Sequence, residues 1–404
     1  MATYYVAEGG TAANKAAATG DGDASTFMSV TRHNDDETFS GLDIIVLSSY
    51  GGAITDIVIP PSSGSAGSPI TYRGDGSTVL DGEDTQTHIF QTDAKSYLTI
   101  EDFTAIDCTD SNLWISRGSN VIIQDITAYG GQTIRTNSVD DLIVRRCEVY
   151  NSDYNGIYIG STNYAGADVA GALVEDCYVH DCDHNGIDVH VNSFGANMSD
   201  ITVRRCWTES NANNGIYCTN GPNEDNRLSD IKIYNNVSCN NTLAGINPNY
   251  LGAGDLIIYT VKVYNNTVYG NGTWGINVWA TDGDIYNNVV IAESGSGIKG
   301  NSNGDASMLA DYNICYDSSG DASGFISWEG VNRTHAAWVS TDGQNANGSF
   351  ENPDLTDAAG GDFTLTAASP CVDTGVNLGS PYNTALLPGS TWPDGVLTAD
   401  QDDY

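Results

Sequence analysis

The chain has 404 residues, of which 52 are acidic and 15 are basic, so its formal net charge is −37 at pH 7. This negative potential argues against nucleic acid or an anionic membrane as a partner, and the sequence contains no apolar run of about 18 residues that could cross a bilayer. With 45 glycines, 22 tyrosines and aliphatic residues confined to short runs, the composition predicts one elongated domain rather than several globules.

Three segments follow one another along the chain. Residues 1–40 are alanine-rich and then polar, and we expect them to cap the coils that follow, because an open end would expose unpaired strand edges. Residues 41–318 consist of short runs rich in Val, Ile, Thr and Tyr, punctuated by Gly, Asn and Asp, which are typical of strands joined by turns. Residues 319–404 are rich in Gly, Asp and Pro and are expected to form an irregular capping region.

The start of the chain bears on localisation. The residues MATYYVAEGG show no basic segment followed by an apolar stretch. Either a signal peptide has been trimmed from this sequence or the protein leaves its cell without one, and we expect it to be extracellular (secreted) or associated with a virion.

Two sequence registers repeat in phase through the middle segment. Copies of Asn-Gly-Ile recur with steps of 30, 29, 30, 30 and 22 residues, at Gly156, Gly186, Gly215, Gly245, Gly275 and Gly297. A second register with the same steps runs through Cys147, Cys177, Cys206, Asn236, Asn266 and Asn288. Such a period predicts stacked coils, so we predict an all-β protein folded as a right-handed parallel β-helix.

Charges and small residues agree with this stacking. The arginine pair at 145–146 falls over the acidic pair at 175–176, which falls over the arginine pair at 204–205. This alternation is what cross-strand pairing favours. The asparagines that replace these charges in the later coils, Asn235, Asn265 and Asn287, are expected to hydrogen-bond along their column. The nine cysteines are predicted to be mostly small core residues without a disulfide framework, although one bridge is left open.

The residue after each inward isoleucine is expected to point outward. This first outward column contains Trp114, Arg135, Tyr158, Asp188, Tyr217, Asn247, Asn277 and Lys299. The outward column two residues later contains Ser116, Asn137, Gly160, His190, Thr219, Asn249, Trp279 and Asn301. We expect a cation, a carboxylate, an imidazole and two phenols to converge here within roughly 15 Å on four coils.

The residues from Ser40 to Asp317 resemble the pectin-lyase-like superfamily of right-handed β-helices, through repeats of the form xIxIxNN followed by NGIxV. The resemblance implies an enzyme that cleaves or epimerises polysaccharides, with its substrate on the strand after Asn-Gly between longer loops. Residues 186–190 are similar to the Gly-Phe-Asp-Pro-His motif of mannuronan C-5 epimerases, a family related in chemistry to alginate lyases. The motif implies catalytic roles for Asp188 and His190. Its tyrosine and proline are replaced here by Asn185 and Val189.

This set of residues suits proton abstraction at carbon 5 of a uronate, which begins both β-elimination and epimerisation. Arg135 is expected to neutralise the substrate carboxylate, and His190 to be the base because its ordinary pKa is nearest neutrality. Tyr158 or Tyr217 would act as the acid, or as the base if its pKa is lowered, and Asp188 would orient His190 or hold a metal. Substrate contacts are expected from Trp114, Asn247, Asn249, Asn277, Trp279 and Lys299, the tryptophans by stacking on sugar rings.

Alternatives to a uronan lyase or epimerase stay open. A glycoside hydrolase on the same fold would use paired carboxylates from Asp153, Asp181, Asp183 and Asp188. A phage tail-type protein that binds or depolymerises glycans would be a homotrimer, whereas an enzyme would be a monomer. The acidic excess favours calcium, with ligands unknown, and no organic cofactor is indicated. The lone histidines, His184 among them, are interpreted as turn or surface residues.

Overall fold

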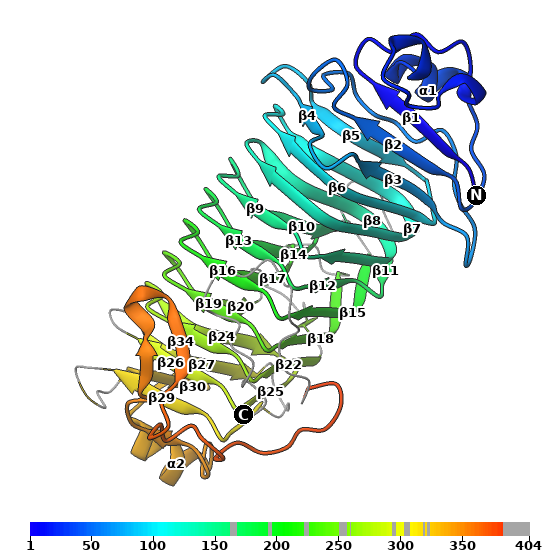
Figure 1. Ribbon diagram of the computed structural model, residues 1–404. Helices are drawn as coiled ribbons and strands as arrows, with labels where there is room; N and C mark the ends of the chain where they lie inside the picture. The colour runs from blue at the N-terminus through cyan, green and yellow to red at the C-terminus, as the bar shows by residue number, and fades with distance from the viewer. Residues whose placement is uncertain are drawn as a thin grey trace.

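The computed structural model describes residues 1–161, 168–192, 196–221, 226–249, 257–258, 260–292, 296–302, 308–317, 320 and 324–382. Its strands pair in parallel, coil upon coil, into an elongated right-handed solenoid (Figure 1). The rungs succeed one another in chain order from the blue N-terminal end, where α1 (Val30–Asp36) lies, to α2 (His335–Asp342) at the orange end. The predicted parallel β-helix is therefore confirmed.

The first face of the solenoid carries the Asn-Gly-Ile repeat. Its strands are β5 (His88–Asp93), the start of β7 (Ser111–Tyr129), the start of β8 (Gln132–Arg145), β10 (Ile157–Gly160), β14 (Ile187–Val191), β17 (Ile216–Asn220), β20 (Ile246–Pro248), β24 (Trp274–Ala280), β27 (Ser296–Ser302) and β30 (Ile326–Trp328). Ile157, Ile187 and Ile216 pair in register and are fully buried, which confirms the predicted inward column.

The second face begins closer to the N-terminus. Its strands are β1 (Thr3–Ala7), β2 (Ile44–Ser48), β3 (Ile70–Gly74), the start of β6 (Leu98–Ile106), the middle of β7, the end of β8, β12 (Leu173–Glu175), β15 (Asn197–Arg204), β18 (Arg227–Tyr234), β22 (Thr260–Tyr264), β25 (Asp282–Tyr286) and β28 (Met308–Asp311), with β11 (Val169–Ala170) and β21 (Ile257–Ile258) beside it. The ladder thus starts within residues 1–40.

The third face returns each coil to the first. Its strands are β4 (Val79–Asp81), the ends of β6 and β7, β9 (Glu148–Tyr150), β13 (Tyr178–His180), β16 (Trp207–Glu209), β19 (Val237–Cys239), β23 (Thr267–Tyr269), β26 (Val289–Ala292), β29 (Ile314–Asp317) and β32 (Ser349–Phe350). Because β30 and β32 pair with earlier rungs, the ladders continue beyond residue 318.

A buried asparagine ladder follows the bend between the second and third faces. In Asn236, Asn266 and Asn288 the backbone N–H and Nδ2 both donate to Oδ1 of the next asparagine, at 2.9–3.0 Å, and the ladder ends at Asn313 and Asn345. The residue before each rung turns the corner with positive φ, for example 53° at Asn265. The sequence predicted such bonding for the column one residue earlier, where Asn287 Nδ2 donates to Asn265 Oδ1 at 3.0 Å, whereas the continuous ladder occupies this neighbouring column. In earlier coils its column is occupied by Cys147, Cys177 and Cys206, and all nine cysteines of the chain are buried free thiols.

The alternating charges of the second face also pair. Arg204 and Arg205 reach back to the 175–176 pair, with N–O distances of 2.7 Å. The arginines at 145–146 likewise reach back, to Gln124 and Asp125, rather than forward to 175–176. The predicted register is therefore correct, but each arginine bonds the coil before it.

The C-terminal segment covers the third face of the later coils. There the outward positions become apolar, at Trp207, Val237 and Val289, and they pack with Phe363 of β34 (Asp362–Leu365). β34 pairs antiparallel with β33 (Leu355–Asp357), and η3 (Ala358–Gly360) joins them. The predicted cap thus includes a lateral cover whose sequence signal is this apolar outward column.

The remaining elements lie at the two ends. η1 (Lys15–Ala17) and η2 (Ala24–Thr26) precede α1, and β31 (Val331–Arg333) pairs antiparallel with β30 before α2. Within the described part of the chain, no helix combines the length and the apolar content that a membrane crossing requires.

Candidate active site

The structure brings the predicted cluster together on the first face. Arg135 of β8 pairs in register with Tyr158 of β10, Tyr158 with Asp188 of β14, and Asp188 with Tyr217 of β17. His190 lies two residues after Asp188 on the same strand, so both side chains point to the same side of the sheet. The predicted register is confirmed, and the chemical roles of these residues stay predictions.

Asp188 is a buried carboxyl group at the centre of the cluster. It is 2 % exposed, and its Oδ2 accepts a hydrogen bond of 3.2 Å from Asn185 Nδ2. Its Oδ1 lies 3.9 Å from His190 Nδ1 and has no hydrogen-bond partner among the described residues. Burial raises the pKa of Asp188 to about 7, against the opposing effect of the amides of Asn185 and Asn155. Near neutral pH this group is therefore both proton donor and acceptor.

His190 is partly open to solvent, with 23 % of its side chain exposed. Burial lowers its pKa, and the nearby His184 lowers it further. The ring is therefore neutral at pH 7 and has a lone pair with which to accept a proton. Tyr158 lies beside it, with ring centroids 6.1 Å apart. Gly160 makes room for this arrangement, because a Cβ there would lie 2.2 Å from Cε1 of Tyr158.

Tyr217 and Arg135 flank this centre. Burial raises the pKa of Tyr217 well above its ordinary value, with Asp188 adding to the rise, so the phenol is a proton donor and the alternative of a lowered tyrosine pKa does not apply to it. Arg135 Nη1 is paired with Asp110 Oδ1 at 3.0 Å. The guanidinium is thus already paired with one carboxylate, and its predicted role toward a substrate carboxylate stays a prediction. Its Nε and Nη2 make no hydrogen bond with the described residues.

Trp114 does not have the role predicted for it. His88, on the preceding coil, stacks on it with ring centroids 5.3 Å apart, and Arg135, on the following coil, lies 4.7 Å from its ring centroid. With both neighbours in place, stacking of a sugar ring on Trp114 is not supported.

The other predicted contact residues extend the outward columns toward the C-terminus. Asn277 Nδ2 donates to Asn247 Oδ1 at 2.9 Å, and Asn247 Nδ2 donates to Asn214 Oδ1 at 2.9 Å. The Oδ1 atoms of Asn277 and Asn249 are buried without a hydrogen-bond partner among the described residues. Such orphaned acceptors are what the hydroxyl groups of a ligand would satisfy. Trp279 is half-buried, and Lys299 lies over the ring of Trp274, 5.7 Å from its centroid.

His184 belongs to the cluster, although its sequence gave it no role. Its Nδ1 lies 2.9 Å from Asn155 Oδ1 and 3.0 Å from Asn185 Nδ2, and its ring stacks on Tyr154. Because one nitrogen cannot serve both contacts, the tautomer decides which of them is a hydrogen bond. Its position in the sequence could have indicated a place in the cluster, because His184 immediately precedes the Asn185-Gly186 corner that leads into Asp188.

The carboxylates expected for a hydrolase, the metal site and the cleft loops remain to be placed. Asp181 and Asp183 are exposed at the corner before β14, and Asp181 has the positive φ of a turn residue. No group of three or more His, Cys, Asp or Glu side chains in the described ranges is arranged to hold a metal ion, and the calcium expectation stays a prediction. Most of the loops expected to wall a cleft, at 162–167, 193–195, 222–225 and 250–256, lie outside the described residues.

Comparisons with known proteins agree with the architecture. Residues 72–238 match a family described as the right handed beta helix region. The chain is a right-handed parallel β-helix. No curated protein matches its sequence.

Solved structures show the same β-helix. A pectate lyase is similar with a TM-score of 0.56 and 17 % identity, over 96 % of this chain and 95 % of that one. A lacto-N-biosidase from Eubacterium ramulus has a TM-score of 0.52 and 11 % identity, over 80 % of this chain and 65 % of that one. The A-module of a mannuronan C-5 epimerase from Azotobacter vinelandii reaches a TM-score of 0.34 at 12 % identity, over 78 % and 94 %, which is too low to support an argument. These identities establish the fold and leave the chemistry to the site.

Proposed function

We propose that this protein acts on glycans that contain uronate residues, by removing the proton at carbon 5, as a polysaccharide lyase or a C-5 epimerase. The observation that carries the proposal is the pairing of a buried carboxyl group, Asp188, with a neutral imidazole, His190, 3.9 Å apart on an outward strand face. Proton abstraction beside a carboxylate needs a neutral base and a donor that neutralises the substrate carboxylate. These two side chains supply both.

The roles follow from the charge states. His190 takes the proton from carbon 5, and the electron pair moves into the substrate carboxylate. Protonated Asp188, with the free nitrogens of Arg135, hydrogen-bonds that carboxylate as its charge grows. In elimination the bond from carbon 4 to its oxygen then breaks, and a tyrosine donates a proton to the leaving oxygen. In epimerisation the tyrosine instead returns a proton to the opposite face of carbon 5.

A hydrolase is less well supported. It needs two carboxyl groups about 5–9.5 Å apart across the bond to be cleaved. Asp188 is the single carboxyl group in the outward columns of β10, β14 and β17, and Asp110 is engaged by Arg135 on another coil. The incubation below also distinguishes hydrolysis by its products.

The proposal is tested by incubating the full chain with alginate, pectate and hyaluronan. Rising ultraviolet absorbance from unsaturated uronate identifies a lyase, whereas a changed proton NMR spectrum without that rise identifies an epimerase. His190→Ala should lower the rate about a thousandfold, the usual size of a general-base effect. His180→Ala, a histidine on β13 of the third face, is the matched control and should keep the parent rate. New reducing ends without unsaturation, or no change in any glycan, would reject the proposal.

We expect the rate to have a narrow optimum in pH near or just below neutrality. The rate should rise with pH as His190 loses its proton, and this rise should occur below the ordinary pKa of histidine because burial lowers the pKa of His190. The rate should then fall above about pH 7, as Asp188 ionises. The two apparent pKa values belong to the coupled pair. His184→Ala should move the acid limb to higher pH, because His184 helps to lower the pKa of His190. An unchanged pH–rate profile in this variant would show that His184 has no part in tuning the base.

A further inference from the structure

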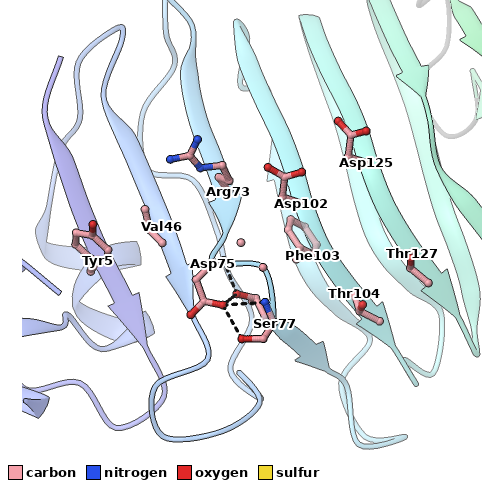
Figure 2. Close-up of a pocket in the computed structure, with 13 residues that line it drawn as sticks. Tyr5, Val46, Arg73, Asp75, Ser77, Asp102, Phe103, Thr104, Asp125 and Thr127 are labelled. Carbon is pink, nitrogen blue, oxygen red and sulfur yellow. Dashed lines mark hydrogen bonds between the residues drawn. The ribbon is translucent and has the colours of Figure 1, made fainter. Parts of the chain in front are cut away.

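A groove of about 730 Å³ lies away from the candidate active site, at the N-terminal end of the solenoid. It follows the corner where the second face turns into the third, across β1, β2, β3, β6 and β7 (Figure 2). The Asp188 cluster, in contrast, is on the first face. Nothing in the proposed chemistry at Asp188 uses this groove.

The sequence builds the groove from side chains of unequal length. Tyr5, Val46 and Arg73 are register neighbours on β1, β2 and β3, so the short Val46 forms a floor between two long side chains. Gly74 keeps the corner low, because a Cβ there would lie 2.0 Å from the carbonyl oxygen of Asp102. Residues 75–78 form a turn at one side, held by hydrogen bonds to Asp75 that Figure 2 shows as dashed lines.

Among the described residues, the Arg73 side chain in this groove has no hydrogen-bond or ion-pair partner. Later residues of its own column bond one another, with Gln124 donating to Glu101 at 2.6 Å and Arg145 to Gln124 at 2.8 Å. All 15 basic residues of the chain lie in the described ranges. The side chain of Arg73 makes no hydrogen bond, ion pair or ring contact with the described residues. A guanidinium at a concave surface rarely lacks hydrogen-bond partners, because its five N–H donors are costly to leave without acceptors.

Asp102, in the adjacent column of corner residues, is likewise a charged residue whose counterparts in later coils are paired. In later coils the corner carboxylates are paired, Asp125 with Arg146 and Asp176 with Arg205, at 2.6–2.7 Å. Asp102 is exposed and has no ion pair or side-chain hydrogen bond with the described residues. Figure 2 shows Arg73, Asp102 and Asp125 on successive coils along the same side of the groove. The groove therefore presents one uncommitted donor group and one uncommitted acceptor group.

The chemistry of the lining selects the ligand. Asp75 and Asp102 outnumber the single Arg73, and Asp125 is already paired with Arg146, so the groove repels an anionic chain such as a uronan. A free amino acid would fit the charge pair but fills little of this elongated volume. Neutral sugars carry vicinal hydroxyls that both donate and accept hydrogen bonds. The hydroxyls of Thr104 and Thr127 and the ring of Tyr5 add the polar and aromatic contacts that such rings use.

We propose that this groove is a second carbohydrate site that binds a neutral glycan chain, with Arg73 donating to, and Asp102 accepting from, hydroxyls of one sugar unit. The site is distinct from the first face and does not depend on the uronate chemistry proposed there. It would hold the protein on neutral polysaccharide.

Calorimetric titration of the full chain with cellohexaose, xylohexaose and mannohexaose tests this inference. At least one should bind with a dissociation constant below about 1 mM, and both Arg73→Met and Asp102→Asn should weaken that binding at least tenfold. The matched controls are Arg227→Met and Asp84→Asn, exposed groups outside the groove, which should bind as the parent does. Thermal unfolding of all four variants confirms that they fold.

His190→Ala separates the two sites. The His190→Ala variant should bind the neutral hexasaccharide as tightly as the parent does, whether or not it still turns over a uronan. The proposal is overturned if none of the three sugars binds with a dissociation constant below about 1 mM, or if trigalacturonate or glycine binds as tightly as the best of them. It is also overturned if both Arg73→Met and Asp102→Asn bind like the parent.

Discussion

Asp188→Asn is expected to give a protein that is more stable than the parent at pH 8 and almost inactive. Burial raises the pKa of Asp188 from 3.8 to about 7, so the folded state binds this proton more tightly than the unfolded state. Stability from this group is complete below about pH 4, falls as the pH rises from about 4 to 7, and stays low above that window. The full difference corresponds to about 4 kcal/mol. Asparagine has nearly the same shape and does not ionise, so it avoids this loss.

The measurement is denaturant unfolding of parent and variant at pH 4 and pH 8. The gain should be present at pH 8 and close to zero at pH 4. Asp176→Asn is the matched control, because Asp176 is also buried but is paired with Arg205 at 2.7 Å. Loss of the Asp176 charge leaves Arg205 with one fewer partner and should destabilise the protein at pH 8 by about 3 kcal/mol. An Asp188→Asn variant that is less stable than the parent at pH 8 would show that the carboxyl group is not strained by burial.

Gain of stability with loss of activity is what separates a functional carboxyl group from a structural one. A structural aspartate such as Asp176 lies beside a cation that stabilises its charge. Among the described residues, Asp188 has an amide donor on Oδ2, no hydrogen-bond partner on Oδ1, and two buried phenols on the neighbouring coils. The fold thus keeps an ionisable group where its charged form is unfavourable, which is the pattern expected where a reactive group has been kept at the expense of stability.

The repeat made the register predictable. A slip of one residue would turn every inward side chain outward, so the phase of the isoleucines specifies which residues face solvent. Tyr158, Asp188 and Tyr217 accordingly lie on adjacent rungs as predicted. The stacking of asparagines was predictable for the same reason, because equal spacing along the chain becomes vertical stacking in space, although the continuous ladder lies one residue after the column for which hydrogen bonding was predicted.

Contacts from coils without the repeat were not predictable. His88 covers Trp114 and Asp110 pairs with Arg135, and both come from the early coils, where no motif marks the phase. The burial of Asp188 was also not predictable from the sequence. Period 2 places its side chain outward, but the neighbouring rings reduce its exposure to 2 %. Side chain size on adjacent rungs, rather than direction, therefore controls the pKa at this position.

Asn266→Ala is expected to destabilise the solenoid more than any surface substitution. Asn266 Nδ2 donates to Ile233 O and to Asn288 Oδ1, and its Oδ1 accepts from the N–H and Nδ2 of Asn236, all at 3.0 Å. Truncation leaves the Ile233 carbonyl and the Asn236 N–H buried without partners. Each such group costs about 1–3 kcal/mol, so the loss should be on the order of 4 kcal/mol.

Denaturant unfolding measures this loss, with Asn240→Ala as the control. Asn240 lies at an exposed corner with φ of 55°, so alanine there should cost only the strain of a left-handed residue, about 1 kcal/mol. Equal losses in the two variants would mean that the buried ladder contributes no more than the corner conformation. A much larger loss at Asn266 would show that the interior bend depends on side-chain amides, because its backbone groups have no strand partner there. Asn266→Cys should fall between the two, since sulfur fills the column in earlier coils but accepts hydrogen bonds only weakly.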